Sequence, residues 1–231
     1  TVYYFFSYFQ TCQINEKVNF SVPTGNFGDV YAGYLSKKMG LPIDKLIVAT
    51  NQNDILHRAI SKGQYKAHSV VETLSPSMDI QVASNFERLI YDINDQNTDK
   101  TSKIMQSIKN EKKYLIEEKE LKKIRKDFVS ETISEQELLS CIKKAYENYK
   151  IIIDPHTAVG LGALEKINLV GKSVVLSTAH PCKFPEAIKK AINIKSELPD
   201  NLNYILSKKE NFIVINNDIE EVKKYILNKL I

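Results

Sequence analysis

A short stretch near the amino terminus combines the residue types that bind phosphate. Residues 22–33 read VPTGNFGDVYAG and hold three of the eight glycines in the chain. A strand that leads through a glycine turn into a helix directs several free backbone N–H groups at one spot, where the helix dipole adds about half a positive charge. Thr24 and Asn26 can add side-chain donors. The turn Gly25-Asn26-Phe27-Gly28 is therefore a candidate phosphate cradle, and the alternative is a turn whose glycines serve backbone geometry alone.

A second group of polar residues follows an apolar run later in the chain. Residues 176–184 read LSTAHPCKF and begin at the last residue of the strand-like SVVL. Ligands of open α/β sheets lie beyond the carboxyl ends of the strands. That position is taken by Thr178, His180 and Lys183. The alternative is a strand end that is merely capped, with a histidine that has no role in binding.

Two other stretches do not define a site by themselves. Residues 160–165, GLGALE, imitate a dinucleotide-binding fingerprint but carry Glu165 where the third glycine is needed, so we reject a nicotinamide site. The P-loop pattern is absent as well. Arg88, in the stretch SNFERL, reads as a surface residue of its helix as readily as an anion ligand.

Helices and strands alternate along the chain, which predicts an α/β fold with a mainly parallel sheet flanked by helices. Strands are expected at 18–22, 46–50, 173–178 and 212–215. Helices are expected at 29–39, 53–62, 84–92, 101–109, 117–125, 134–148, 157–167, 184–194 and 218–230. We expect an α/β portion with the phosphate loop over 1–98, a charged helical excursion without a sheet strand over 99–150, and a return to the α/β portion with C-terminal helices over 151–231.

Composition narrows the classes of protein. The 231 residues are 43% hydrophobic and 26% charged, as in globular proteins, and no apolar run approaches the roughly 20 residues of a membrane span. Three widely spaced cysteines predict neither a disulfide framework nor a metal site, and indicate the cytoplasm. The net charge of +4 comes largely from mixed-sign helices, so neither a nucleic acid nor a membrane is expected as a partner.

Taken together, five stretches resemble threonine synthase, a pyridoxal-phosphate enzyme family of the tryptophan-synthase-β-like fold (fold type II). They are SVPTGNFGDVYAGY, TLSPSMDIQVASNFERLIYD, IRKDF, DPHTAVG and STAHPCKFPEAI. Each is weakly specific, but they occur in the family order from about residue 3 to 190. The resemblance therefore covers most of the chain.

The resemblance implies a cofactor, a substrate and a set of site residues. Pyridoxal 5'-phosphate would be held by its phosphate at the glycine turn with Thr24, and Thr178 would hydrogen-bond the pyridine nitrogen. The substrate would be O-phospho-L-homoserine, which reacts with water to give L-threonine and phosphate, with the cofactor as electron sink. Residues implied on the substrate side are Asn85, Arg88, Asp154, His156 and Lys183.

The lysine that carries the cofactor in this family has no counterpart here. The family places it in an F-K-D-like motif well before the glycine turn, whereas only about twenty residues precede the turn in this chain. Lys126 belongs to a different family stretch, and Lys183 does not match the Schiff-base position. The chain thus resembles a carboxyl-terminal half without a catalytic lysine, and the aromatic start TVYYFFSYF is expected to be a helix entered partway along; the alternative is an ordinary N-terminal helix that has lost its Met.

Three readings remain open from the sequence. The chain could be the carboxyl-terminal part of a threonine synthase that is inactive alone, a non-catalytic remnant, or one half of a split enzyme whose partner chain carries the lysine. A relative that acts on serine derivatives is a more distant fourth, because DPHTAVG and SNFERL count against it. An apolar face that begins with Tyr3, Phe5, Phe6 and Phe9 is expected to be exposed and open to self-association.

Overall fold

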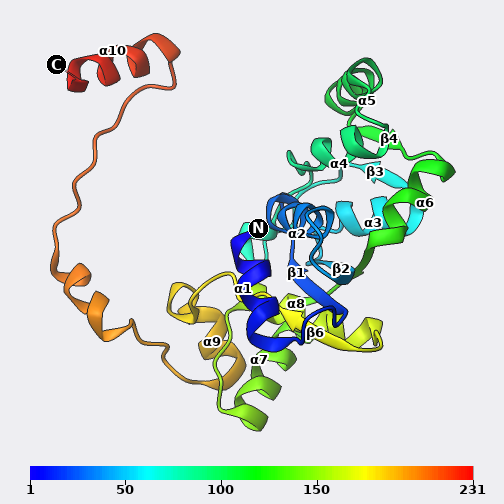
Figure 1. The fold of residues 1–231 in the computed structure, drawn as a ribbon. Helices are drawn as coiled ribbons and strands as arrows, with labels where there is room; N and C mark the ends of the chain where they lie inside the picture. The colour runs from blue at the N-terminus through cyan, green and yellow to red at the C-terminus, as the bar shows by residue number, and fades with distance from the viewer. Residues whose placement is uncertain (231) are drawn as a thin grey trace. The chain divides into compact units, whose positions relative to one another are not determined.

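The computed structural model describes residues 1–230 as a chain of alternating helices and strands (Figure 1). The strands are β1 (Val18–Pro23), β2 (Ile43–Thr50), β3 (Gln64–Lys66), β4 (Lys113–Leu115), β5 (Phe128–Thr132) and β6 (Lys172–Val175). The α-helices are α1 (Val2–Thr11), α2 (Gly28–Lys38), α3 (Ile55–Lys62), α4 (Phe86–Ile93), α5 (Thr98–Glu111), α6 (Glu118–Asp127), α7 (Glu135–Tyr149), α8 (Pro155–Ile167), α9 (Pro185–Ile192) and α10 (Ile219–Leu230). Short 3-10 helices are η1 (Pro76–Met78), η2 (Pro181–Lys183) and η3 (Asp200–Ser207).

The main sheet is parallel and confirms the predicted fold class. Its order is β5-β2-β1-β6, and every neighbouring pair of strands is parallel. All four carboxyl ends therefore lie at the same edge. Helices α2 and α3 contact the sheet on one face, and α8 contacts β1, β2 and β5 on the other. A separate antiparallel pair of strands, β3 and β4, lies beside α5 and α6, and these four elements are here called the outer lobe.

Successive side chains of each strand point to opposite faces of the sheet, which divides the apolar core into two layers. Phe20, Val22 and Val48 belong to the layer under α2, α3 and α4, whereas Ile47 and Ala49 belong to the layer under α7 and α8. Side chains of a strand point to opposite faces in turn, so this division follows directly from the apolar runs of the sequence. Such doubly covered parallel strands read as continuous apolar stretches.

Helix α8 packs closely on the sheet at Gly160. A Cβ on Gly160 would lie 3.0 Å from Cγ1 of Val175 and 3.2 Å from Cγ of Pro23. The approach lets the hydroxyl of Ser21 donate to the Gly160 carbonyl at 2.6 Å. A Cβ on Gly162 would instead lie 3.1 Å from Sγ of Cys141 in α7, so the two glycines of the GLGALE stretch serve packing against the sheet and against α7.

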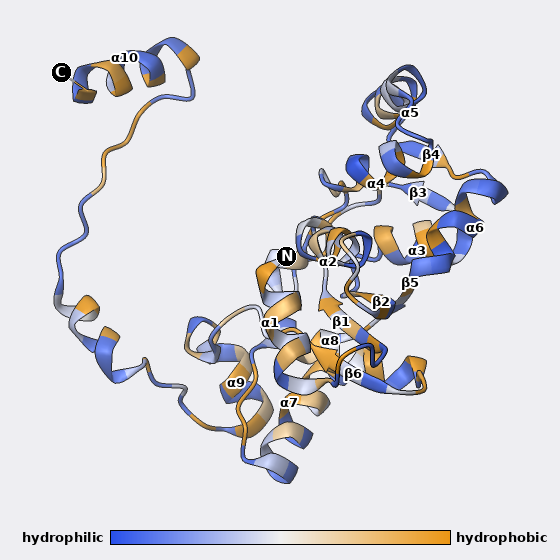
Figure 2. Ribbon diagram, viewed as in Figure 1, coloured by the Kyte–Doolittle hydropathy of each residue, from blue (hydrophilic) through white to orange (hydrophobic). Residues whose placement is uncertain are grey.

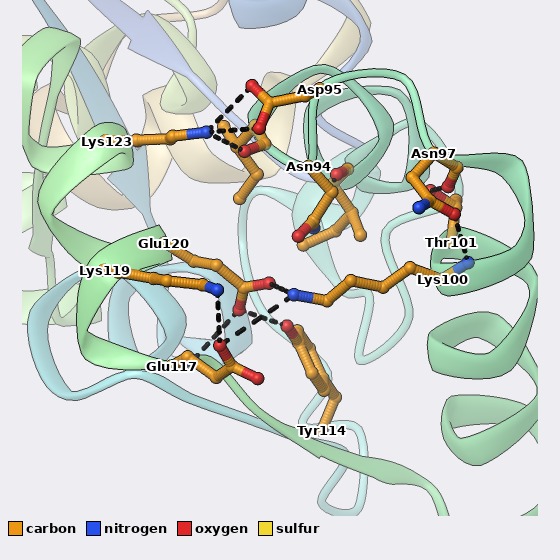
Figure 3. A network of polar contacts seen from close by, with 12 residues as sticks. Asn94, Asp95, Asn97, Lys100, Thr101, Tyr114, Glu117, Lys119, Glu120 and Lys123 are labelled. Carbon is orange, nitrogen blue, oxygen red and sulfur yellow. Dashed lines mark hydrogen bonds and ion pairs between the residues drawn. The ribbon is translucent and has the colours of Figure 1, made fainter.

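A buried carboxylate organises the outer lobe (Figure 3). Glu120 is 1% exposed and accepts hydrogen bonds from the Lys100 ammonium at 2.6 Å, the Tyr114 hydroxyl and the Glu117 backbone N–H at 3.0 Å. Burial alone would raise the pKa of Glu120, but these donors outweigh it and hold the pKa below its ordinary value. The network thereby ties α5, β4 and the first turn of α6 together.

Two of the predicted elements differ from the structure. The stretch 99–150 does contain a sheet strand: β5 pairs with β2 from Leu46↔Phe128 to Thr50↔Thr132. It was missed because FVSET is short and follows a strongly charged helix. The strand predicted at 212–215 is absent among the described residues, since that stretch has no regular structure and its apolar side chains stay exposed.

The chain divides into two compact units, Thr1–Ser196 and Glu197–Ile231. The first unit includes all of 1–98 and 99–150 and the first part of 151–231. The second contains η3 and α10, and none of its described hydrophobic residues is buried. Figure 2 colours the hydrophobic residues of this unit orange. None of the helices over residues 1–230 has the length and apolar character that crossing a membrane requires.

Candidate cofactor-binding site

A cavity of about 380 Å³ opens at the carboxyl edge of the main sheet, where β1 and β6 end. Its lining residues are Pro23, Thr24, Gly25, Asn26, Phe27, Gly28, Asp29, Ser77, Met78, Asn85, His156, Thr178, Ala179, Lys183 and Phe184. All six residues predicted to bind the cofactor are among them, together with three of the five predicted on the substrate side. Segments more than 150 residues apart in the sequence thus meet around one space.

The glycine turn offers unpaired backbone donors to this cavity. Among residues 1–230, no group accepts a hydrogen bond from the N–H of Gly25, Asn26, Phe27 or Gly28. Phe27 adopts the left-handed conformation, with φ 65° and ψ 5°, directly before α2 begins at Gly28. A turn of this kind before a helix N-terminus makes a concave group of N–H dipoles that suits an anion.

Close packing explains why the turn and its helix need glycine. A Cβ on Gly25 would lie only 2.7 Å from the Ser77 carbonyl oxygen. A Cβ on Gly33, one turn and a half into α2, would lie 2.6 Å from the ring of Tyr4 in α1. Gly28 is less confined, with the Asn85 amide nitrogen 3.3 Å from the Cβ position. Gly25 and Gly33 therefore allow the neighbouring segments to approach α2.

The segment that approaches Gly25 is fixed by a buried polar network. The side-chain amide of Asn51, just after β2, donates to the Asp79 carboxylate at 2.8 Å and to the Ser75 hydroxyl at 2.9 Å. The amide of Asn53 donates to the same Asp79 oxygen at 2.9 Å, and the hydroxyl of Thr73 donates to it at 2.7 Å. These bonds hold residues 73–79 in one conformation, so that Ser77 and Met78 form a wall of the cavity.

His156 supports the same wall from α8. Asp154, the N-cap of α8, is fully buried and accepts from the backbone N–H of His156 and from its Nδ1, both at 2.9 Å. The other ring nitrogen, Nε2, accepts from the Ser77 N–H at 3.2 Å. A ring that donates at Nδ1 and accepts at Nε2 is the neutral Nδ1–H tautomer. Burial alone would raise the pKa of Asp154, but hydrogen bonds from His156 and Thr157 outweigh it and lower the pKa.

The side chains of Thr24 and Asn26 are partly committed to local structure. The Thr24 hydroxyl donates to the Val22 carbonyl at 2.6 Å. Asn26 Oδ1 accepts from the Ser84 hydroxyl at 2.9 Å, and the Asn26 carbonyl accepts from the Asn85 amide at 3.2 Å. The donors that remain for a ligand are therefore the backbone N–H groups of the turn and the amide nitrogen of Asn26.

The opposite side of the cavity is more open. Thr178, three residues beyond the end of β6, and Lys183 in η2 are both exposed. The ring of Phe184 lies 4.7 Å from that of His156, centroid to centroid. A hydroxyl, an ammonium group and an aromatic ring thus line this side of the cavity.

The structure separates two predicted substrate residues from the cavity. Arg88 is exposed on α4 and does not line the cavity, because the apolar face of α4 buries Phe86 and Leu89 instead. Asp154 lies behind His156 and does not line the cavity either. No sequence pattern pointed to Asp29, Ser77, Met78 or Phe184 as lining residues, since their contribution depends on how distant segments fold together.

The residues present fit a phosphate group joined to a polar ring. The turn supplies N–H donors, and its glycines have no side chain to keep a ligand away from them. Asp29 is the one carboxylate among the lining residues that would repel an anion. Burial is the main cause of the raised pKa of Asp29, while the Tyr4 hydroxyl, 3.1 Å from its Oδ1, opposes the rise. The cavity volume is within the range of small-molecule sites.

Comparison with known proteins identifies the family. A family model described as "Threonine synthase, C-terminal" matches residues 157–226. Threonine synthase from Pseudomonas aeruginosa is 41% identical over 97% of this chain and 49% of its own length. The chain is homologous to the carboxyl-terminal half of threonine synthase. The enzyme from Saccharomyces cerevisiae is 42% identical over 99% of this chain and 50% of its own length.

Solved threonine synthases share the fold. The crystal structure of pyridoxal-phosphate-bound threonine synthase from Brucella melitensis superposes with a TM-score of 0.92 at 39% identity, over 98% of this chain and 49% of that one. Yeast threonine synthase gives a TM-score of 0.86 at 38% identity, over 99% of this chain and 50% of that one. The chain therefore spans about half the length of the threonine synthases that it matches, and its parallel sheet is that of a fold-type II pyridoxal-phosphate enzyme.

Proposed function

We propose that this chain supplies the phosphate-binding part of a threonine synthase site, which converts O-phospho-L-homoserine and water to L-threonine and phosphate. The observation that carries the proposal is that four backbone N–H groups at Gly25 to Gly28, which have no acceptor among residues 1–230, share one cavity with the Thr178 hydroxyl. Homology to threonine synthase supports the choice of reaction. Bound pyridoxal phosphate would supply the electron sink that makes α- and β-carbon protons removable.

The glycine turn, Thr178 and Lys183 each have a defined task in this proposal. The turn binds the cofactor phosphate through charge-assisted N–H bonds, which are stronger than bonds between neutral groups. Thr178 donates to or accepts from the pyridine nitrogen; a hydroxyl, unlike a carboxylate, leaves that nitrogen unprotonated. Lys183 places a positive charge at the rim, where it would attract the substrate phosphate.

His156 is a positioning residue in the proposal. Its Nε2 holds the Ser77 N–H, and its Nδ1–H is fixed by the buried Asp154. Both ring nitrogens are thus engaged within the protein and unavailable to move a proton. Asn85 also has a positioning role, because its side-chain amide donates to the Asn26 carbonyl at 3.2 Å and thereby stabilises the turn. The substrate-side roles of Asn85, His156 and Asp154 are therefore indirect.

A binding titration tests the cofactor-phosphate assignment. Pyridoxal phosphate and pyridoxal, which lacks the phosphate, are each titrated into the chain while the cofactor absorbance is followed. Gly28→Val places a branched side chain at the turn and should abolish binding of the phosphate form. Glu118→Val at the first position of α6, an exposed site, is the matched control and should bind normally.

Two outcomes would overturn the assignment. One is equal affinity for pyridoxal and pyridoxal phosphate, which would mean that the phosphate makes no contact. The other is unchanged binding of pyridoxal phosphate by the Gly28→Val variant, provided that its circular dichroism spectrum matches that of the unaltered chain. Circular dichroism of both variants separates loss of the site from loss of the fold.

A further inference from the structure

The segment that carries the Thr178 hydroxyl, residues 177–179, has few polar contacts to fix it. It follows Leu176, whose backbone N–H is the last of this stretch to pair with β1. In the described part of the chain, the only hydrogen bond that reaches the segment joins the side chains of Thr157 and Ser177, whose hydroxyl oxygens are 3.4 Å apart. The polar anchoring of Thr178 therefore comes from this one contact with α8.

The close packing of α8 on β6 brings the two hydroxyls together. A Cβ on Gly160 would lie 3.0 Å from Cγ1 of Val175. Thr157 comes three residues before Gly160, so both lie on the same side of the helix. Ser177 comes two residues after Val175, and alternate residues of an extended chain point to the same face. The intervening Leu176 belongs to the core layer of the opposite face, in agreement with this alternation.

Thr157 is itself held by a buried carboxylate. It is 6% exposed, and its hydroxyl donates to Asp154, which is fully buried. The same carboxylate accepts from the ring Nδ1 of His156, whose Nε2 accepts from the Ser77 backbone N–H. Asp154 is thus connected to one wall of the cofactor cavity through His156 and Ser77, and to the opposite side through Thr157 and Ser177.

We infer that Thr157 is a positioning residue for the cofactor: through Ser177 it holds Thr178 at the end of the cavity where the pyridine ring binds. The identity of the ligand in this inference rests on the proposed function. Thr157 does not line the cavity, so its effect on binding is indirect. A hydroxyl that is held in place beforehand loses less conformational freedom when it binds a ligand, and this favours binding.

Two substitutions separate the contact from the fold. Thr157→Val removes one hydroxyl and keeps the branched shape of the side chain. Ser177→Ala removes the other hydroxyl at an exposed position and leaves the bonds to Asp154 in place. Each should weaken binding of pyridoxal phosphate about three- to tenfold, the range expected for one hydrogen bond. Isothermal titration calorimetry measures the affinities, and circular dichroism shows whether each variant is folded.

A deaza analogue of pyridoxal phosphate, in which carbon replaces the ring nitrogen, distinguishes positioning from a general structural effect. It keeps the phosphate but has no ring nitrogen for Thr178 to bond. The unaltered chain should bind it more weakly than pyridoxal phosphate, and Ser177→Ala should not weaken it further. Thr157→Ser keeps the hydroxyl and should bind both ligands as the unaltered chain does. Thr98→Val, at the exposed first position of α5, is the matched control and should also bind normally.

The methyl group of Thr178 reports on the positioning without any cofactor. Its NMR order parameter measures how tightly the side chain is held on the picosecond-to-nanosecond timescale. Thr157→Val and Ser177→Ala should both lower this order parameter in the free chain, whereas Thr157→Ser and Thr98→Val should leave it unchanged. Because no ligand is present, this readout is independent of the proposed function.

Three results would overturn the inference. They are an unchanged Thr178 order parameter in Thr157→Val and Ser177→Ala, unchanged affinity of both variants for pyridoxal phosphate when the unaltered chain prefers it to the deaza analogue, and equal weakening of the two ligands by Ser177→Ala. Equal binding of the two ligands by the unaltered chain, or binding of neither, would instead reject the proposed contact of Thr178 with the ring. A lowered order parameter in both variants would then still establish that Thr157 positions Thr178.

Discussion

His156 is joined to Asp154 by two hydrogen bonds, one from its backbone N–H and one from its ring Nδ1, each 2.9 Å long. The pair lies at the first turn of α8 and is buried. With Nδ1–H so fixed, Nε2 is left as an acceptor and takes the N–H of Ser77 at 3.2 Å. The N-terminus of α8 thereby fixes the position of Ser77 in the wall of the cofactor cavity.

His156→Phe should destabilise the fold, because it keeps a ring beside Phe184 but removes both ring nitrogens. The Ser77 N–H and an Asp154 oxygen lose a partner, which costs about 1–3 kcal/mol in the free energy of unfolding. Urea denaturation followed by circular dichroism measures the change. His68→Phe, at an exposed position whose side chain makes no hydrogen bond among residues 1–230, should change the free energy by less than about 0.5 kcal/mol. Equal effects of the two variants would contradict this role of His156.

The pH dependence of stability should reveal the Asp154 carboxylate. Its pKa is lowered in the folded chain by hydrogen bonds from His156 and Thr157. A lowered pKa means that the carboxylate stabilises the fold above its unfolded pKa of about 3.9, and that this contribution is lost as pH falls through the folded pKa. The stability difference between the unaltered chain and Asp154→Asn should therefore be constant near neutrality and shrink below about pH 4. A difference that stays constant through acid pH would contradict the assignment.

Gly25→Ala should be more disruptive than Gly28→Ala. The added Cβ at Gly25 would lie 2.7 Å from the Ser77 carbonyl oxygen, which the Asn51–Asp79 network holds in place, whereas at Gly28 the nearest group is the movable Asn85 amide at 3.3 Å. Forced overpacking of this kind costs about 1–3 kcal/mol. Thermal or urea unfolding of both variants measures the difference. Equal stabilities would show that residues 73–79 can shift freely.

The unit around the phosphate turn could be predicted from sequence because it is local. The strand, the glycine turn and the helix occupy consecutive residues, and the structure places them at Val18–Pro23 and Gly28–Lys38 as the pattern indicated. Thr178 was predicted to share an edge with the turn, and it does, because β1 and β6 are parallel neighbours. Because neighbouring parallel strands end at the same edge of the sheet, the residues that follow β1 and those that follow β6 line one site.

Contributions that depend on long-range packing could not be predicted. Ser77 meets Gly25 only because Asn51 and Asp79 fold the intervening loop back, and no local pattern encodes that. Arg88 was assigned to the site from its motif, but the apolar face of α4 decides which way it points. Strand β5 is short and polar at one end, so its place in the sheet comes from pairing with β2 rather than from its own periodicity.

The chain by itself should not catalyse the reaction. The resemblance implies a cofactor-linking lysine in an F-K-D-like motif, and no F-K-D occurs in residues 1–231. Without that lysine, pyridoxal phosphate is held only by non-covalent contacts at the turn. Treatment with pyridoxal phosphate and borohydride, followed by peptide mapping, should label no single lysine stoichiometrically, and O-phospho-L-homoserine should release no phosphate. Specific labelling of one lysine with turnover by this chain would contradict the expectation.

The Gly25–Gly28 turn and Thr178 are proposed to hold the two ends of one cofactor. A crystal structure of the chain grown with excess pyridoxal phosphate tests it most directly. We expect phosphate oxygens within hydrogen-bond distance of the N–H groups of Gly25 to Gly28, and the pyridine nitrogen next to the Thr178 hydroxyl. Cofactor density elsewhere on the chain, or an empty turn at saturating cofactor, would contradict it.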